Sequence, residues 1–382
     1  MTWLPNATVT IGGTNYDSLA IANVQIGYGR STIWEQPRAG FARIQILNDT
    51  NASYNFDMNQ EVIVKVHNSS AVDTVIFTGF ITQVDNVIQA NGSIKTVAIH
   101  QITALAPFAF MNRKTVGSSD YPKESDTDRI TRILNECGVT IDTIDSPSIY
   151  EFQTRSASPA NGYTLAAEYA QQAFGYIYET ASGKVGFANE SRRTLDVGTN
   201  GYNVIPNNYV LWDSVKSQKS LNEVLNYVTV GYRAGYEIAE NSGSQASYGK
   251  IAAQISTELH NQSDAITQAE RYITLRALPR TSLDSFTIQL DSDNVSAANL
   301  DKLLNMRIGF PLQFTSLPNA IKNSVYQGFV EGWTINFTRY QYQLTLTTSD
   351  SIYSLTPTRW QDVSATLKWQ DVDPTLQWLA YP

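Results

Sequence analysis

The stretch VYQGFVEGWTINF (residues 325–337) and the earlier stretch VIFTGFITQVDNVIQ (residues 75–89) carry the same pattern. Each places a Gly-Phe-aliphatic triplet in the middle of a strand-like run. The triplets are Gly79, Phe80 and Ile81 in the first copy and Gly328, Phe329 and Val330 in the second. Because a repeated unit dictates architecture, we infer one small β-domain that the chain contains twice.

The sequence on both sides of the triplets repeats as well. Strand-like runs precede them at residues 60–66 (QEVIVKV) and 307–314 (RIGFPLQF), and alternating runs follow at about Lys95–Ile99 and Tyr342–Leu346. The lead-ins also correspond, at Ala42–Ile46 and Phe286–Leu290. The copies therefore run from Asn59 to Leu105 and from Arg307 to Leu355.

Length and composition indicate several domains with few surface charges. A chain of 382 residues exceeds one ordinary core, which favours two to four domains. Charged residues make up only 16% of the chain, where roughly a quarter is usual. Uncharged polar and aromatic groups cost less to desolvate, so this composition suits extensive partner contact. A Thr- and Tyr-rich β protein explains it equally well.

Charge and cysteine content exclude some functions. The net charge is −8 and no basic run stands out, so the chain is not expected to grip nucleic acid by phosphate neutralisation. Cys137 is the one cysteine, which rules out an intrachain disulfide and fits a reducing compartment. The sequence predicts no signal peptide and no membrane segment, since no apolar run approaches roughly 20 residues.

These patterns predict a mainly β chain with an α+β insert. Two related tube-like β-barrel domains, residues 1–112 and 214–350, flank a small α+β domain at residues 113–213. A C-terminal tail follows at residues 351–382. Helical spacing and end signals predict helices at Ser125–Cys137, Gly162–Phe174 and Ser263–Ala277, a hairpin at Tyr176–Ala188 and a mobile loop at Gly235–Lys250.

The tail contains a short tryptophan repeat. WQDVSATLK (residues 360–368) is followed at once by WQDVDPTLQ (residues 369–377), so tryptophans recur every nine residues. A nine-residue spacing puts neighbouring indoles on opposite sides of a single strand or helix. We expect short extended segments that either pack on their own subunit or dock on another protein. The candidate docking residues are Trp360, Trp369, Trp378, Leu367 and Leu376.

The sequence contains no recognisable catalytic or metal-binding pattern. The three histidines, His67, His100 and His260, lie far apart and form no zinc-binding spacing. No nucleophile elbow, phosphate loop or dinucleotide fingerprint occurs in the required context. Cys137 falls on the apolar stripe of its helix, which predicts a core residue. We therefore predict no enzyme activity, no cofactor and no metal.

The order of these domains resembles a known family. The segments at residues 9–13, 21–30, 39–49, 161–188 and 324–350 together are similar to phage minor tail proteins of the baseplate or tail-tip hub class. The tryptophan repeat is similar to tails of minor tail proteins of long-tailed phages. The resemblance covers about residues 8 to 350 and depends on domain order and not on a catalytic motif.

The resemblance implies a structural role in the virion. Hubs of this class are homotrimers in which two barrels per chain form a pseudo-sixfold ring. Such a ring joins the tail tube or distal tail protein to a threefold tip and lets DNA pass. The implied partners include the tape measure protein and tip fibres or receptor-binding proteins, with assembly in the host cytoplasm. Two repeats in each of three chains would supply six docking surfaces.

Two other functions are compatible with the residues. Surface Trp and Tyr could stack on sugars, which would make the chain a carbohydrate-binding or host-receptor-binding tail protein. A cell-wall hydrolase is the second alternative, because a carboxylate pair of the glycosidase type leaves no sequence signature.

Overall fold

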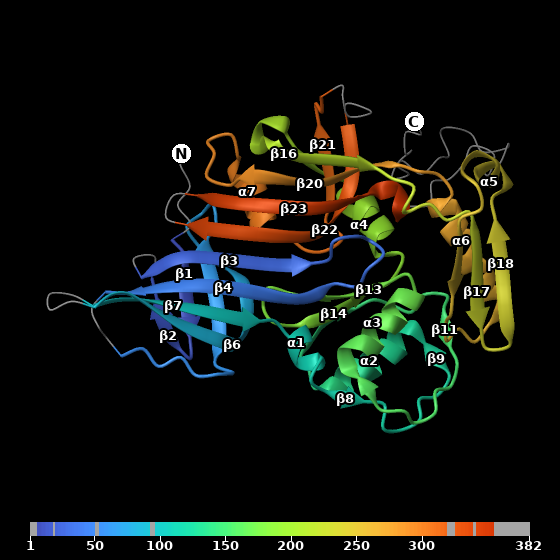
Figure 1. Cartoon of the computed structure of the whole chain (residues 1–382), viewed down its shortest axis with the longest axis horizontal. Helices are drawn as coiled ribbons and strands as arrows, with labels where there is room; N and C mark the ends of the chain where they lie inside the picture. The colour runs from blue at the N-terminus through green and yellow to red at the C-terminus, as the bar shows by residue number, and fades with distance from the viewer. Residues whose placement is uncertain are drawn as a thin grey trace.

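The computed structural model describes residues 6–17, 20–49, 53–91, 96–318, 325–338 and 341–354, and these are mainly β. One sheet of 13 strands runs through the molecule (Figure 1). Its strands are β1 (Thr8–Ile11), β2 (Thr14–Tyr16), β3 (Ile21–Gly29), β4 (Arg38–Asn48), β5 (Glu61–His67), β6 (Asp73–Asn91), β7 (Thr96–Leu105), β15 (Asn203–Ile205), β16 (Val210–Lys219), β20 (Thr281–Gln289), β21 (Pro311–Thr315), β22 (Val325–Thr338) and β23 (Tyr342–Asp350).

The order of strands in this sheet shows the repeat directly. Neighbours follow the path β16-β20-β23-β22-β3-β4-β7-β6-β5-β1-β2, with β21 attached to β22 and β15 attached to β21. We define the first unit as β3-β4-β7-β6-β5 and the second unit as β16-β20-β23-β22-β21. Each unit has the same connections in the same chain order, and every pair within both units is antiparallel.

The register of the two units also agrees residue by residue. Gly79 pairs with Val62 as Gly328 pairs with Leu312. In β6 the ladder shifts between Ile81 and Gln83, and in β22 it shifts between Val330 and Gly332. The bulged residues are therefore Thr82 and Glu331. Because a bulge is a specific local device, its recurrence at one position supports a true duplication.

The described residues do not form the expected pair of closed barrels. The two units lie side by side in a single sheet, joined by the antiparallel pair β3·β22 (Figure 1). Strand β3 uses its outer edge to continue the second unit, so that edge is not available to close the first unit on itself. The described part of the sheet ends openly at β16 and at β2.

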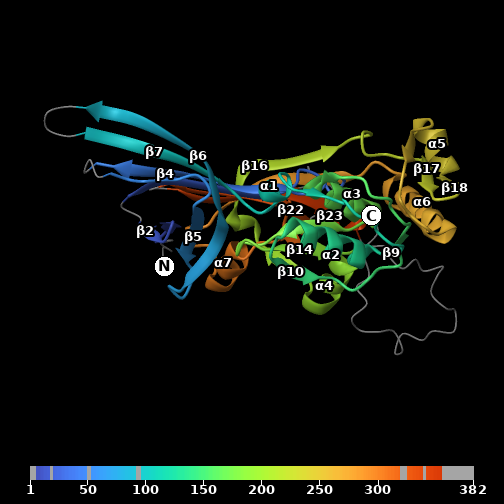
Figure 2. The ribbon, with the colours of Figure 1, turned by 90° about the horizontal axis from the view of Figure 1, so that it is seen from below.

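One face of the sheet is packed and the other is open. Figure 2 views the sheet from the side, with β5, α7 (Ala297–Leu304) and α4 (Arg192–Asn200) on the same side of it. Alternate residues of the strands, such as Val24, Ile26 and Ile44, point to this side and are fully buried. They belong to a hydrophobic core that spans both units.

The insert has a core of its own. It contains α1 (Phe108–Met111), α2 (Asp126–Cys137), α3 (Gly162–Gln172), β13 (Tyr176–Glu179), β14 (Val185–Ala188) and β10 (Ile141–Ile144), with short strand pairs β8 (Thr115–Val116) with β12 (Ala160–Asn161) and β9 (Glu124–Ser125) with β11 (Glu151–Phe152). The predicted cap is confirmed, because the Ser125 side chain accepts a hydrogen bond from the Asp128 N–H. Gly138 ends α2 with a φ of 69°.

A small module lies against the insert. It consists of β17 (Tyr227–Tyr232), β18 (Gly235–Glu240), α5 (Ser242–Tyr248), β19 (Ala252–Ile255) and α6 (Gln262–Arg276). Val228 and Val230 share the hydrophobic core of the insert, as do Ala265 and Ala269. The predicted boundaries at 112, 213 and 350 stay predictions. Among the described helices, none is long and apolar enough to cross a membrane.

Candidate functional site

The joint between the two units is the most constrained place in the sheet. Strands β3 and β22 pair from Gly29–Gly332 to Asn23–Thr338. Gly29 has a φ of +98°, and a Cβ there would lie 2.3 Å from the Glu331 carbonyl oxygen. The Arg30 N–H donates to that same oxygen at 2.9 Å. The close approach of the two backbones therefore requires glycine at position 29.

A buried cluster of three charges lies beside this joint. Arg30 Nε lies 2.6 Å from Glu331 Oε2, and Arg193 Nη1 lies 2.7 Å from Glu331 Oε1. Arg193 Nη2 adds a second bond to Oε2 at 2.9 Å, and the Ser349 hydroxyl donates to Oε1. All three charged side chains are at most 5% exposed. We call Arg30, Glu331 and Arg193 the joint triad.

The triad connects three parts of the chain. Arg30 follows the last strand residue of β3, Glu331 is the bulged residue of β22, and Arg193 lies on α4. Burial raises the pKa of the Glu331 carboxyl, but the facing Arg193 and Arg30 outweigh it and hold that pKa at about 2. The carboxyl is therefore ionised, and the triad keeps a net charge of +1 away from water.

Aromatic rings cover the apolar side of the joint. Tyr28 and Trp333 are paired in register, and their rings stack with centroids 5.3 Å apart. Phe337 and Val24 form another pair and are both buried. The ring of Tyr176 lies 5.1 Å from the Arg30 guanidinium and 5.3 Å from that of Arg193. The joint therefore combines apolar packing with a satisfied ionic network.

The predicted repeat triplets occupy equivalent places in the two units. Ile81 and Val330 are buried in the shared core. Phe80 packs edge-on against Phe110 of α1, whereas Phe329 packs with Val197 of α4. Each triplet phenylalanine thus contacts a helix that lies outside the strands of its unit.

Neighbouring atoms lie so close to both triplet glycines that no side chain fits at either position. A Cβ on Gly79 would lie 2.5 Å from the Leu105 carbonyl oxygen and 2.7 Å from the Phe77 ring. A Cβ on Gly328 would lie 2.4 Å from the Ser349 carbonyl oxygen and 2.7 Å from the Tyr326 ring. The obstacles are equivalent in the two units, because each ring is two residues before its glycine.

We expect Gly328→Ala to lower the free energy of unfolding by about 1–3 kcal/mol. The added methyl group would clash with the backbone of the neighbouring strand β23 and overpack a buried position. Urea unfolding at fixed protein concentration measures the change. Gly198→Ala is the matched control, since a Cβ there meets nothing within 4 Å and helix α4 gains from alanine. Equal midpoints for Gly328→Ala and the parent chain would contradict the packing argument.

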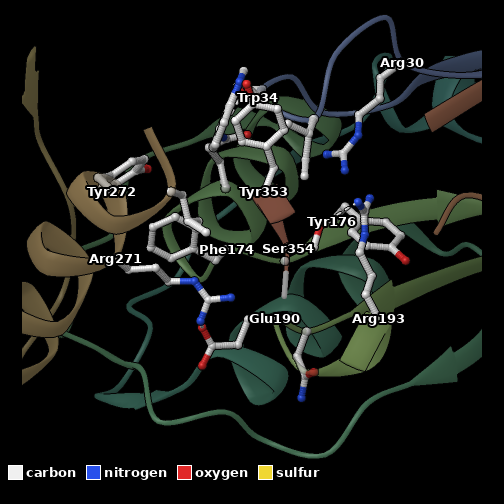
Figure 3. Close-up of a pocket in the computed structure, with 15 residues that line it drawn as sticks. Arg30, Trp34, Phe174, Tyr176, Glu190, Arg193, Arg271, Tyr272, Tyr353 and Ser354 are labelled. Atoms are coloured by element: carbon white, nitrogen blue, oxygen red, sulfur yellow. Dashed lines mark hydrogen bonds and ion pairs between the residues drawn. The ribbon is translucent and has the colours of Figure 1, made fainter. Parts of the chain in front are cut away.

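A small cavity adjoins the triad (Figure 3). Arg30 and Arg193 lie on one side of it, and Arg271, which pairs with Glu190, lies on another. Its volume is about 50 Å³, which is room for a few water molecules. Pockets for cofactors and sugars usually measure roughly 300–1,000 Å³. The cavity therefore suits bound water better than a ligand.

A second buried carboxylate ties the insert to the first unit. Glu179 of β13 accepts the Gly40 N–H at 2.6 Å and the Phe108 N–H at 2.5 Å. None of the described ion pairs involves Glu179. Burial raises the pKa of this carboxyl to about 8, against the lowering effect of the two backbone donors.

The remaining predictions concern Cys137, metal binding and the tryptophan repeat. Cys137 is buried in the core of the insert, and burial raises the pKa of its thiol to about 11, as suits a core residue. Within the described ranges, no three His, Cys, Asp or Glu side chains converge to hold a metal ion. Trp360, Trp369, Trp378, Leu367 and Leu376 lie outside the described residues.

The joint triad was not among the residues predicted from the sequence. Its signal was nonetheless present, because Glu331 interrupts an otherwise apolar run between Val330 and Gly332. A charge at the centre of a buried strand requires a partner. Nothing in the sequence identifies Arg30 or Arg193 as those partners, since they lie 301 and 138 residues away.

The fold is similar to those of solved tail proteins. The 43 kDa tail protein of prophage MuSo2 from Shewanella oneidensis matches with a TM-score of 0.63 at 10% identity, over 92% of this chain and 99% of that one. A tail protein from Neisseria meningitidis matches with a TM-score of 0.63 at 10% identity, over 92% and 98%.

A third similar structure belongs to a bacterial secretion system. A component of the type VI secretion system of E. coli, described as structurally similar to the T4 bacteriophage tail proteins gp27 and gp5, matches with a TM-score of 0.53 at 13% identity. The match covers 92% of this chain and 79% of that one. No family model and no curated protein sequence matches the chain. The resemblance to phage tail proteins is thus confirmed at the level of the fold.

Proposed function

We propose that this protein is a structural component of a phage tail, acting as the hub of the tail tip or baseplate. Three copies form a closed ring in which the six units of paired strands alternate around a pore. The ring joins the hexameric tail tube or distal tail protein to a threefold tip. Its place is the virion, after assembly in the host cytoplasm.

The observation that carries this proposal is the in-register duplication. Both units have the same strand order, the same bulge position and the same triplet contacts. A threefold assembly of such chains presents six similar surfaces, which resolves the mismatch between a trimer and a hexameric tube. A chain with a single unit would leave that mismatch unsolved.

The open face of the sheet suits passage of DNA. Most of its side chains are uncharged hydrogen-bonding groups, namely Gln25, Gln45, Gln101, Thr103, Ser285, Thr287, Gln289, Thr334, Asn336, Gln343, Thr345 and Thr347. The charged exceptions include Arg43, Asp85 and Lys216. Several bond one another across strands, as Thr287 does with Thr345 at 2.9 Å. A neutral wall gives phosphates little to condense on.

The proposed neighbours follow from this position in the tail. They are the tube or distal tail protein on one side, the tape measure protein within, and tip fibres or receptor-binding proteins on the other. Residues 351–382 are proposed as a docking tail, with Trp360, Trp369 and Trp378 as its anchors. If deletion of residues 356–382 left tail assembly intact, the docking role would be excluded.

Native mass spectrometry tests the ring. We expect a single species with three times the 42.4 kDa mass of the chain, and labelled antibody bound at the end of the tail in virions. A monomer at every concentration, or label along the tail shaft, would overturn the proposal. A glycan array and a host cell-wall zymogram distinguish it from the receptor-binding and hydrolase alternatives.

A further inference from the structure

Two buried donors in the wall of the small cavity have no acceptor. Within the described residues, Nε1 of Trp34 and Nε of Arg271 are buried without a hydrogen-bond partner, and both side chains line the cavity. The Ser354 hydroxyl, which also lines it, accepts a hydrogen bond from Arg193 at 2.9 Å, so its own hydrogen can still donate. Orphaned donors around one cavity indicate a water molecule or an ion that accepts from them.

The charges around the cavity are unbalanced. The charged side chains among its described lining residues are Arg30, Arg193, Arg271 and Glu190. Arg271 is paired with Glu190, whereas Arg30 and Arg193 share the single carboxylate of Glu331. Three positive charges therefore face two negative ones. Because an uncompensated buried charge is costly, the cavity favours a negatively charged occupant over neutral water.

The size of the cavity limits this occupant to a small ion. Its volume of about 50 Å³ is far below the roughly 300–1,000 Å³ of pockets for organic ligands. One water molecule needs roughly 10–15 Å³ of such volume, and a chloride ion is only slightly larger. A monatomic anion has no preferred bonding direction, so it can accept from donors on different elements.

The donors come from separate parts of the chain. Trp34 lies in the loop between β3 and β4, Arg271 lies on α6 of the small module, and Ser354 follows the short 3₁₀ helix η2 (Ser351–Tyr353). Figure 3 shows these three residues around the same space, with the two arginines of the joint triad to one side. The Arg276 guanidinium of α6 lies 4.3 Å from the centre of the Trp34 ring, so the module already touches the loop beside the cavity. An ion bound among these donors would tie the small module to the sheet.

We propose that the cavity binds one halide-sized anion, such as chloride, which accepts hydrogen bonds from Trp34 Nε1, Arg271 Nε and the Ser354 hydroxyl. The anion replaces one of the water molecules for which the cavity has room, and it cancels the positive charge that the joint triad leaves over. It links the loop after β3 to the small module within one chain. The site is therefore independent of how many chains assemble in the tail.

The chloride dependence of stability tests the site. Urea unfolding of the full chain is followed at fixed protein concentration and constant ionic strength, while chloride replaces gluconate, an organic anion too large for the cavity. An ion that binds only the folded chain raises its stability in proportion to ln(1 + [L]/Kd). We expect the urea midpoint to rise with chloride along this curve, which yields the dissociation constant. A midpoint that is the same in both salts would overturn the site.

Two tryptophan variants separate binding in the cavity from a general salt effect. Trp34→Phe keeps an aromatic ring but removes the N–H, and we expect the dissociation constant for chloride to rise at least tenfold, because a hydrogen bond to an ion is lost. Trp212→Phe is the matched control, since Trp212 lies on β16, is 45% exposed and is not part of the cavity wall. This control should bind chloride as the parent chain does. Equal chloride dependence in the two variants would contradict the assignment.

A crystal of the parent chain grown in sodium bromide requires no variant. Bromide has the charge and nearly the size of chloride, and its anomalous scattering locates the ion directly. We expect an anomalous peak within hydrogen-bond distance of Trp34 Nε1 and Arg271 Nε. Peaks that occur only elsewhere on the chain, or no peak at all, would rule out the site and leave the proposed role in the tail standing.

Discussion

Glu331→Ala is expected to lower the free energy of unfolding by about 3–5 kcal/mol, because it leaves Arg30 and Arg193 buried without their counter-charge. No other described carboxylate bonds either guanidinium, so neither arginine has a substitute partner. The loss also removes the ion pair between Arg193 of α4 and the joint. Urea unfolding at fixed protein concentration measures it.

Two further variants separate charge burial from simple truncation. Thr82→Ala alters the equivalent bulge of the first unit, where no charge is buried, and should cost less than about 1 kcal/mol. The triple variant Arg30→Met, Glu331→Leu and Arg193→Met removes all three charges, and we expect it to recover much of the stability that Glu331→Ala loses. A loss below 1 kcal/mol for Glu331→Ala would show that the triad does not hold the joint.

Glu179 is expected to make stability fall as pH rises. Its pKa is raised from 4.5 to about 8 in the folded chain, so the folded state binds a proton that the unfolded state has released between these values. The stabilisation is complete below pH 4.5 and is lost as pH rises through 8. One such group contributes a slope of at most about 1.4 kcal/mol per pH unit.

Comparison with Glu179→Gln isolates this term, because all other titrating groups are common to both proteins. Urea midpoints at pH 5, 6, 7 and 8 should show the advantage of the parent chain shrinking by about 2–4 kcal/mol in total. Exchange of the Gly40 and Phe108 amide hydrogens should quicken over the same range. Parallel stability curves for the two proteins would refute the assignment.

The sequence predicted elements whose signals are local. Helix α2 begins at a capping serine and ends at a glycine, and its apolar stripe is buried. Helix α6 begins one residue before the prediction and ends one residue before it. The hairpin at Tyr176–Ala188 forms as β13 and β14. The repeat could also be predicted from the sequence, because equivalent steric contacts require glycine in both triplets.

Other features depended on tertiary contacts and were missed or predicted wrongly. The expected mobile loop at Gly235–Lys250 forms β18 and α5, since Asn241 caps α5 and the Ser244 hydroxyl donates to the Ala277 carbonyl. Helix α7 and strand β16 were not predicted. The polar residues that suggested a loop serve here as caps and hydrogen-bond donors.

The joint shows why two barrels were expected where one sheet forms. Each unit alone has strands enough for a barrel, and the sequence of a single unit does not reveal where its edges pair. That choice depends on Gly29 and Gly332, which let two backbones meet, and on the Arg30–Glu331 contact that follows them. These residues belong to different units, so no local pattern connects them.

The most direct test of the proposed ring is a reconstruction of the assembled oligomer by electron cryomicroscopy without imposed symmetry. We expect a threefold ring in which the first and second units alternate around one pore, with a 60° rotation that superposes the strands of one unit on those of the next. A trimer in which the two units lie at different radii, or an assembly whose chain number is not three, would contradict it.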